Sequence, residues 1–457
     1  MRTLLSWLGL CVILALSLAI SACDRSDADE SPEIAQLADV LDRLPPEVRA
    51  RLSPFQRGIP GRWREVREDD PEFLADVERL SSLGYAAGVQ PADGRGGAHT
   101  FDASRVQPGL SFWTSGHAPE AILSDLEGRL VHTWHATYDQ VFPDSPLPKR
   151  SIATDYWRAA RLLPDGSVVA IFEGLGIFRV DSDSRVRWAQ RNGAHHDFAI
   201  APDGTIWALV RDAHLVPRVS ARGPILEDSI AVLDPRTGEE KRRFSLLEAF
   251  ERGPEPDWTQ AYYAFWKREG AIDLADSGPD DIFHTNSIEI LDDTLADVPG
   301  FRPGNLLVSM RNLDMIAVVD PERESVVWSR AGLTTLQHDP SVTPDGALLV
   351  FDNQWQPLQR SRVVWLDPRD DSVRREWAGT EASPLYSHSC GTSQLLANGN
   401  VLVVETDQGR VLEVAPDDEI VWEFRNPHRA GEHGEYIASV FGMTRVPRGS
   451  LDWLAGS

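Results

Sequence analysis

Residues 159–172 read AARLLPDGSVVAIF, and this stretch decides the fold. A short run ends at Leu163, the Pro-Asp-Gly turn of residues 164–166 follows, and a second run rich in β-branched residues continues to Phe172. Proline and glycine at these turn positions favour a tight reversal between two strands. Further runs at 177–180 and 186–188 complete a predicted unit of four short strands.

The same pattern recurs along the chain. Copies start at His195, at His284, at Gln337 and near His388, each with a turn of the Pro-Asp-Gly kind or an equivalent. The last run of each unit ends at or near an aromatic residue: Trp188, Phe244, Trp328, Trp377 and Trp422. Units of about 40 residues with four strands each are typical of β-propellers, because one unit cannot bury both of its faces alone.

The two ends of the repeat region supply a sixth unit. Runs at 110–114, 121–124 and 131–134 lack a first strand, whereas residues 441–446 match the start of a unit. We therefore predict an all-β, six-bladed β-propeller over 105–457, in which the C-terminal strand is the innermost strand of the first blade. Such a closure leaves no free edge in the ring of blades.

The N-terminal part has a different character. Residues 1–22 combine Arg2, an apolar run and small residues before Cys23, which is typical of a bacterial lipoprotein signal peptide. We expect a lipidated Cys23 to anchor the protein to a membrane of the cell envelope, on its periplasmic side. Residues 23–104 are predicted as a short helical arm and linker, with helical spacing at 31–52 and 70–83 and no chemistry of their own.

Charge and cysteine content narrow the possible partners. The net charge of -25 argues against binding to nucleic acid or to an anionic membrane surface, so membrane contact is expected through the lipid anchor alone. Cys390 is the one cysteine outside the targeting segment, which excludes an internal disulfide and predicts a buried thiol.

Propeller geometry predicts where the polar residues gather. The first strand of each blade lines the channel, and its start shares a rim with the turn after the second strand. The starts of the first strands place three histidines at one level, together with two other polar residues: His196, His284, His338, Asn286 and Arg158. The turns on that rim contribute Glu173, Arg211, Arg311, Asn353 and Asp407. A single channel histidine is as easily structural as functional, but three beside arginines favour a functional site. His195 has the opposite strand parity to His196 and is predicted to be structural.

Several segments together resemble the bacterial arylsulfotransferase family over most of 105–447. They are His195–Phe198, Phe283–Ser287, Ser309–Arg311, Gln337–Asp339, Phe351–Asn353 and Leu395–Asn400. The resemblance implies transfer of a sulfuryl group from an aryl sulfate to a phenol, without a nucleotide sulfate donor.

The resemblance also implies roles for individual residues. His338 matches the nucleophile that forms a sulfohistidine, Arg311 matches the sulfate-binding arginine, and His196 and His284 match the supporting histidines. On this interpretation we expect no cofactor and no metal. The predicted substrate-binding residues are Asn286, Arg211, Asn353 and Arg158.

Two other functions stay open at this stage. Three histidines with an open fourth position could hold Zn²⁺ in a hydrolase or lyase, although Arg311 nearby opposes a cation. The propeller could also be a non-enzymatic binding lipoprotein, because fold does not determine function.

Overall fold

The computed structural model describes residues 85–145, 152–216, 219, 224–253, 281–354, 360–381, 383–451 and 453–454. The chain divides into two compact units, and every described residue belongs to the unit of Glu68–Arg268 and Pro279–Ser457. The predicted signal peptide, Cys23 and the predicted helices at 31–52 and 70–83 lie outside the described residues. Within the described ranges, no helix is long and apolar enough to span a bilayer.

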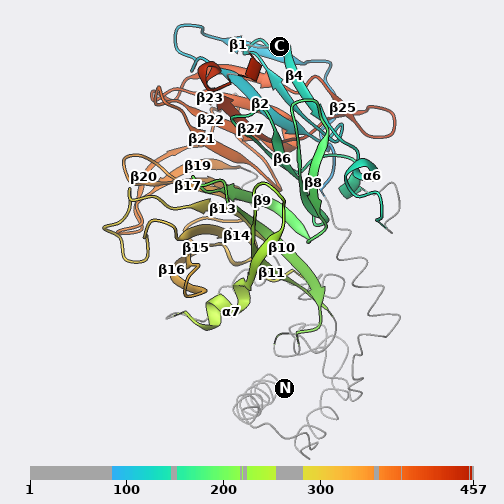
Figure 1. Ribbon diagram of the computed structural model, residues 1–457. Helices are drawn as coiled ribbons and strands as arrows, with labels where there is room; N and C mark the ends of the chain where they lie inside the picture. Colours follow the sequence, from blue (N-terminus) through green and yellow to red (C-terminus); the bar gives the residue numbers. More distant parts are fainter. Residues whose placement is uncertain are drawn as a thin grey trace, which may run out of the picture. The chain divides into compact units, whose positions relative to one another are not determined.

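Six antiparallel blades form a β-propeller, which confirms the predicted fold (Figure 1). From the innermost strand outward, blade 1 has β27 (Val440–Val446), β2 (Leu110–Ser115), β3 (Glu120–Ser124) and β4 (Leu130–His135). Blade 2 has β5 (Ala159–Leu162), β6 (Val168–Phe172), β7 (Gly176–Val180) and β8 (Val186–Gln190). Blade 3 has β9 (Ala194–Ile200), β10 (Ile206–His214), β11 (Ile225–Leu233) and β12 (Glu240–Ser245).

The other three blades follow in chain order. Blade 4 has β13 (Thr285–Ile290), β14 (Leu306–Met310), β15 (Met315–Asp320) and β16 (Ser325–Ala331). Blade 5 has β17 (His338–Val342), β18 (Leu348–Asp352), β19 (Arg362–Leu366) and β20 (Val373–Trp377). Blade 6 has β21 (Thr392–Leu395), β22 (Val401–Glu405), β23 (Arg410–Val414), β24 (Ile420–Arg425) and an added β1 (Gly97–Phe101).

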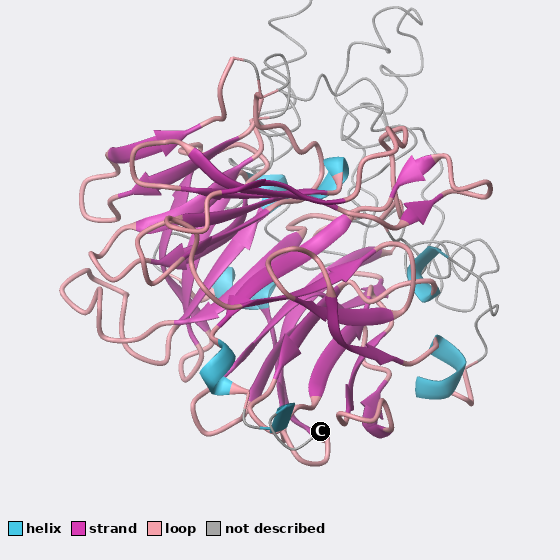
Figure 2. Cartoon of the chain, turned by 90° about the horizontal axis from the view of Figure 1, so that it is seen from above, coloured by secondary structure: helices cyan, strands magenta, loops and turns pink. Residues whose placement is uncertain are grey.

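Helices are short and few in the described part, including α6 (Tyr138–Val141) and α7 (Leu246–Glu251) (Figure 2). A small ribbon, β25 (Arg429–Ala430) and β26 (Tyr436–Ile437), precedes β27.

The C-terminal strand closes the ring as predicted. β27 pairs with β2 along its length, with Met443 opposite Trp113 and Val446 opposite Leu110. Every residue of β2 is buried. The arm differs from its prediction as a linker, because residues 97–101 form β1 on the outer edge of β24. This pairing gives hydrogen-bond partners to an edge that would otherwise be open.

The core lies between neighbouring blades. The second strands of blades 2, 4, 5 and 6 are buried at every position, because each of their faces packs against another blade. The tryptophans predicted at strand ends connect adjacent blades. Their indole N–H groups donate to main-chain oxygens of the next blade in four pairs: Trp134 to Gly166, Trp188 to Pro235, Trp377 to Asp418 and Trp422 to Leu126.

Polar side chains also connect the innermost strands around the channel. In each case a side-chain oxygen accepts the main-chain N–H of the next blade's inner strand. The pairs are Asp197 with Ile288 (3.1 Å), Glu289 with Val342 (3.0 Å), Asp339 with Ser393 (2.8 Å) and Gln394 with Arg445 (2.8 Å). Because buried amide groups need partners, these contacts hold the inner strands in register.

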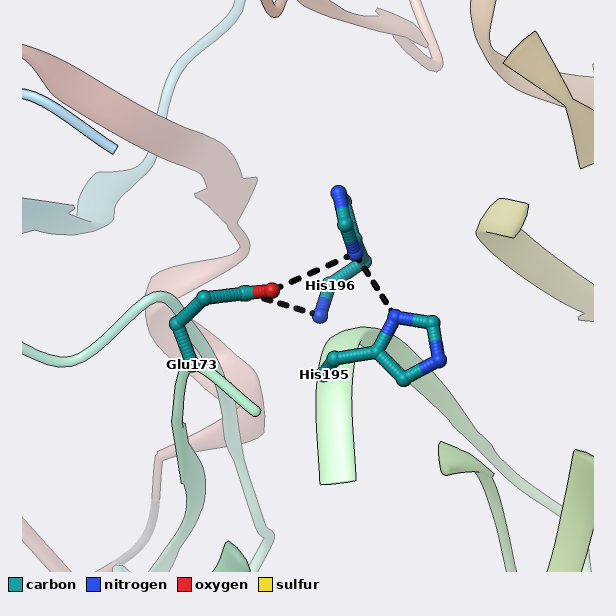
Figure 3. A group of neighbouring side chains, drawn as sticks. All are labelled: Glu173, His195 and His196. Carbon is teal, nitrogen blue, oxygen red and sulfur yellow. Dashed lines mark hydrogen bonds and ion pairs between the residues drawn. The ribbon is translucent and has the colours of Figure 1, made fainter. Parts of the chain in front are cut away.

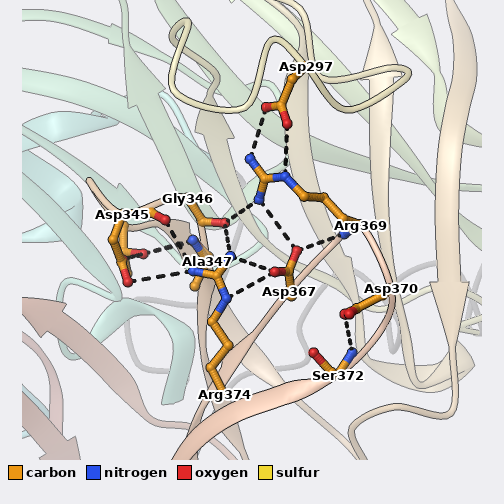
Figure 4. Close-up of polar contacts among 10 residues, drawn as sticks. Asp297, Asp345, Gly346, Ala347, Asp367, Arg369, Asp370, Ser372 and Arg374 are labelled. Carbon is orange, nitrogen blue, oxygen red and sulfur yellow. Dashed lines mark hydrogen bonds and ion pairs between the residues drawn. The ribbon is translucent and has the colours of Figure 1, made fainter.

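Turns at the end of the blades away from the histidines carry surface ion pairs (Figure 4). Arg369 of blade 5 pairs with Asp297 of the β13–β14 connection at 2.8 Å, and it also donates to the main-chain oxygen of Gly346 at 3.0 Å. Gly346 is the glycine of a Pro-Asp-Gly turn and has φ +73°, which favours glycine. Exposed pairs of this kind contribute at most about 1 kcal/mol each, so the buried strands dominate stability.

Candidate functional site

The predicted histidines lie where the inner strands depart from regular β structure. His196 and His284 have φ values of +53° and +49°, and Asp339, directly after His338, has +51°. Register shifts interrupt the pairing of β9, β13 and β17 with their neighbours at these points. Such backbone is costly for residues other than glycine and clusters at functional sites. Simple strand alternation therefore does not determine where these side chains point.

Two of the histidines meet around a phenol from the N-terminal arm. Nε2 of His196 and Nε2 of His284 are 3.2 Å apart. The Tyr85 hydroxyl lies 2.6 Å from Nε2 of His196 and 2.7 Å from Nε2 of His284. Burial raises the Tyr85 pKa well above 10, so the phenol stays protonated. No chemistry was predicted for this segment, and no repeat or motif marks Tyr85.

The hydrogen bonds beyond these atoms allow one consistent proton assignment. Nδ1 of His284 lies 2.5 Å from the Asp281 carboxylate, to which it donates, so Nε2 of neutral His284 is an acceptor. Tyr85 can then donate to His284 and accept from Nε2 of His196. In that tautomer, Nδ1 of His196 accepts from Nδ1 of His195, 2.7 Å away. The result is a continuous chain from His195 to Asp281.

Glu173 anchors His196 from the neighbouring blade (Figure 3). Its carboxylate, fully buried, accepts the main-chain N–H of His196 at 3.0 Å and lies 3.4 Å from Nδ1. Arg158 and Arg211 place guanidinium nitrogens 3.8 Å and 3.5 Å from the same carboxylate. The structure thus pairs both arginines, predicted to bind substrate, with Glu173.

Arg158 also contacts two aromatic rings. Its guanidinium carbon lies 5.0 Å from the centre of the Tyr85 ring and 5.3 Å from that of Phe441. One of its nitrogens approaches the Cys390 sulfur at 3.5 Å. Cys390 is a free, buried thiol as predicted, and burial raises its pKa to about 11. The thiol therefore remains protonated near neutral pH.

His338, the first residue of β17, is buried. Its Nδ1 is 2.9 Å from the amide oxygen of Asn353, whereas Nε2 is buried without a hydrogen-bond partner among the described residues. Burial, followed by the charge of Arg311, holds the His338 pKa well below 6.5. The imidazole is neutral at physiological pH. Asn353, predicted to bind substrate, has its amide directed instead to His338 and two main-chain oxygens.

Arg311 and Asn286 complete the predicted set. Arg311 begins the short 3₁₀ turn after β14, is half-buried, and donates to the Asn312 side chain at 3.0 Å. The Asn286 amide nitrogen donates to the main-chain oxygen of Gln337 at 2.9 Å, and its buried oxygen has no partner among the described residues. Arg311 supplies positive charge to the same site that contains His338 and Tyr85.

A cavity of about 440 Å³ lies on the channel side of these residues. Its walls include Arg158, His196, Asn286, His338 and Phe441. Pockets of this size, lined by aromatic surface and a few convergent polar groups, suit small organic ligands. The structure thus brings together His196, His338, Asn286 and Arg158, which were predicted from separate blades.

The described residues that could hold a metal are not the three histidines predicted from the sequence. Ligand atoms of Glu173, His195 and His196 lie within 4.8 Å of one another, and all three residues are buried. The nearby guanidinium groups of Arg158 and Arg211 already neutralise the Glu173 carboxylate and oppose a cation there. This donor set therefore fits a divalent metal poorly.

Comparison with known proteins gives one family match. A family model described as Arylsulfotransferase (ASST) matches residues 159–427. No curated protein matches the chain.

Three solved structures share 11–13% sequence identity with the chain. A protein of unknown function from Bacteroides caccae is 11% identical, with a TM-score of 0.47 and coverage of 73% of this chain and 98% of that one. A virginiamycin B lyase from Staphylococcus aureus is 13% identical, with a TM-score of 0.34 and coverage of 59% and 69%. A streptogramin B lyase is 11% identical, with a TM-score of 0.40 and coverage of 79% and 97%. Likenesses this weak support no inference about function.

Proposed function

The chain belongs to the arylsulfotransferase family, and from this membership we propose that it moves a sulfuryl group from a phenolic sulfate ester to a phenol through a sulfohistidine on His338. No nucleotide sulfate takes part in this reaction. The observation that carries the assignment is the state of the His338 ring. The Asn353 amide oxygen accepts a hydrogen bond from Nδ1–H of His338, so Nε2 of His338 bears the lone pair. Nε2 is buried, and His338 lines the cavity.

A neutral imidazole nitrogen of this kind is a competent nucleophile. In the first step, Nε2 of His338 attacks the sulfur of the donor, and the bond from sulfur to the phenolic oxygen breaks. The departing phenolate accepts a hydrogen bond from Nε2–H of His196 and takes up a proton from solvent as it leaves. In the second step, an acceptor phenol gives its proton to Nε2 of His284 and attacks the sulfur, the bond from sulfur to Nε2 of His338 breaks, and neutral His338 is restored.

Arg311 and Asp281 stabilise the charges that develop during the reaction. The sulfuryl group carries negative charge on its oxygens, and Arg311 can stabilise this charge where water is largely excluded. The half-buried carboxylate of Asp281 next to His284 stabilises that ring when it accepts a proton. The three predicted histidines therefore have separate roles: His338 is the nucleophile, His196 donates a hydrogen bond to the phenolic oxygen, and His284 accepts the proton of the acceptor phenol.

The test uses a chromogenic aryl sulfate with and without an acceptor phenol. We expect acceptor-dependent release of the donor phenol, ping-pong kinetics, and loss of transfer in His338→Ala. A matched control is His132→Ala, because His132 lies on β4 away from the site and contacts the Ser182 main chain. Transfer retained by His338→Ala would reject the nucleophile, and a wild-type protein without turnover would favour a non-enzymatic binding lipoprotein.

The second candidate is a metal-dependent hydrolase or lyase, which would have to bind its metal at Glu173, His195 and His196 against the charges of Arg158 and Arg211. Metal analysis of the purified protein distinguishes the two functions. Stoichiometric zinc, with turnover abolished by chelation, would replace the sulfotransferase assignment.

We also propose that Cys23 carries a lipid and holds the protein on the periplasmic side of the cell envelope. The sequence around Cys23 supports this location. Cys23→Ala should move the protein from the membrane fraction to the soluble fraction of cell lysates. Unchanged fractionation would contradict the anchor.

A further inference from the structure

We propose that Tyr85 occupies the position of the acceptor phenol and is itself an acceptor, so that the enzyme forms a tyrosine O-sulfate on its own chain. This inference rests on the proposed sulfotransferase function. Tyr85 is then a modification site on the N-terminal arm, and its phenol competes with external phenols for the acceptor position.

The contacts of the Tyr85 hydroxyl match those that an acceptor needs. A phenol that attacks sulfur must lose its proton to a base within hydrogen-bond reach. The Tyr85 oxygen has such a base in Nε2 of His284 at 2.7 Å, while Nε2 of His196, 2.6 Å away, donates to the same oxygen. Because Asp281 fixes the proton on Nδ1 of His284, Nε2 of that ring is available to accept the phenolic proton.

The surroundings of the Tyr85 ring also match those of a bound phenol. The Arg158 guanidinium lies 5.0 Å from its centre, and the rings of His196 and His284 meet it edge-on at 5.4 Å and 6.4 Å. A cation near a ring and imidazole edges around it bind an aromatic group through its π system. They do not depend on the ring's substituents. The chain's own phenol fills this site.

Tyr85 is presented by specific contacts to the propeller. Its main-chain N–H donates to the Tyr156 hydroxyl at 2.9 Å, and that hydroxyl donates to the Tyr85 main-chain oxygen at 2.5 Å. The Tyr156 ring stacks on Phe441 at 4.5 Å. Two residues further along, the main-chain oxygen of Ala87 accepts from Ser439 at 2.8 Å. The arm is therefore fastened where its phenol reaches the histidines.

His338 lines the same cavity as His196, whose Nε2 contacts the Tyr85 hydroxyl at 2.6 Å. The charges of Arg158 and Arg311 also influence both the His338 ring and the Tyr85 phenol. In the proposed step, the Tyr85 oxygen bonds to the sulfur held on Nε2 of His338, and the bond from nitrogen to sulfur breaks. Its electron pair returns to Nε2, and the phenolic proton passes to Nε2 of His284. The products are a tyrosine sulfate, neutral His338 and protonated His284.

The experiment incubates the full chain with an aryl sulfate and no acceptor phenol, followed by digestion and mass mapping. We expect one added SO₃ on the Tyr85 peptide and none on the peptide of Tyr436, a partly exposed tyrosine in β26. His338→Ala and Tyr85→Phe should both lack this label. Label on His338 with Tyr85 unmodified overturns the proposal and leaves the sulfotransferase function standing. Absence of label from both, without transfer to any external phenol, overturns both.

Kinetics with an external phenol provide an independent measurement. Tyr85→Ala should lower the acceptor KM by about tenfold, because the site no longer has to release its own occupant before binding. Tyr156→Phe, which removes the hydroxyl that holds the Tyr85 main chain, should shift KM in the same direction and reduce labelling. A loss of external transfer in Tyr85→Phe would instead make Tyr85 a proton-transfer residue and overturn the proposal.

Discussion

Asn353 fixes the tautomer of His338. Its amide oxygen accepts from Nδ1 at 2.9 Å, while its amide nitrogen donates to the main-chain oxygens of Ser387 at 2.8 Å and Cys390 at 3.1 Å. Because both amide hydrogens face carbonyl oxygens, the amide cannot reverse without losing these bonds. Nε2 of His338 is therefore held without a proton and with its lone pair toward the site.

Removal of this contact should slow transfer more than it weakens binding. In Asn353→Ala the His338 ring loses its fixed tautomer and orientation, which we expect to cost about 1–3 kcal/mol, or about 5- to 150-fold in kcat. The donor KM should change less. Steady-state kinetics measure both, with Asn398→Ala in the turn before β22 as the control. A kcat close to that of the wild type would show that Asn353 does not act through His338.

The buried histidines should destabilise the fold in acid. Burial depresses the pKa of His195, His196 and His338 in the folded chain, so below pH 6.5 the unfolded chain binds protons that the folded chain does not. Stability is thus complete above about pH 6.5 and falls by up to about 1.4 kcal/mol per pH unit for one group.

Thermal unfolding across pH 7.5 to 5 tests this effect. His338→Gln should have a shallower decline of the melting temperature than the wild type, whereas His132→Gln on β4 should not change the slope. Equal slopes in the wild type and His338→Gln would contradict the assignment of a buried neutral ring.

Asp339 should have the opposite pH dependence. Burial raises its pKa from 3.8 to about 7, so the folded chain retains a proton that the unfolded chain has lost. The corresponding stability is present below pH 3.8 and disappears as the pH rises to about 7. Asp339→Asn should remove that decline while preserving an oxygen acceptor for the Ser393 N–H. Asp203→Asn, in an exposed turn, is the control. The prediction fails if Asp339→Asn and the wild type have parallel stability profiles between pH 4 and 7.

Closure by β27 should be essential for solubility. Truncation after Pro427 removes β27 and opens the edge of β2, whose residues are all buried. We expect an insoluble product, since an exposed apolar strand edge promotes aggregation. Thr100→Pro disturbs β1, the outermost strand of blade 6, and should lower the melting temperature yet leave the protein soluble. Size-exclusion chromatography separates these outcomes, and a soluble, monomeric truncated chain would contradict closure.

Repeat spacing was sufficient to predict the blades, because a Pro-Asp-Gly turn and its flanking strands are local features. It was also sufficient to place three histidines near the starts of inner strands: His196 lies in β9, His338 opens β17, and His284 directly precedes β13. It could not predict side-chain directions there. His196 and His284 have positive φ values, and the Glu173 carboxylate of blade 2 accepts the His196 N–H.

Asn353 and Tyr85 mark the limit more clearly. Asn353 was predicted from its position on the rim alone, and Tyr85 was not predicted, because it lies in a segment without a repeat. The amide of Asn353 faces His338 because blade 6 supplies main-chain acceptors at Ser387 and Cys390. Tyr85 reaches the histidines because two contacts hold the arm. Tyr156, which precedes blade 2, donates to the main-chain oxygen of Tyr85, and the Ser439 N–H donates to that of Ala87.

The sequence by itself determined the six-bladed ring, its closure by residues near the C-terminus and the family to which the chain belongs, because turns, strand periodicity and motif order are encoded locally. Only the tertiary structure decided which histidine has a free, unprotonated nitrogen and which phenol lies between the other two. Those features depend on hydrogen bonds between residues distant in sequence, such as the 111 positions that separate Tyr85 from His196.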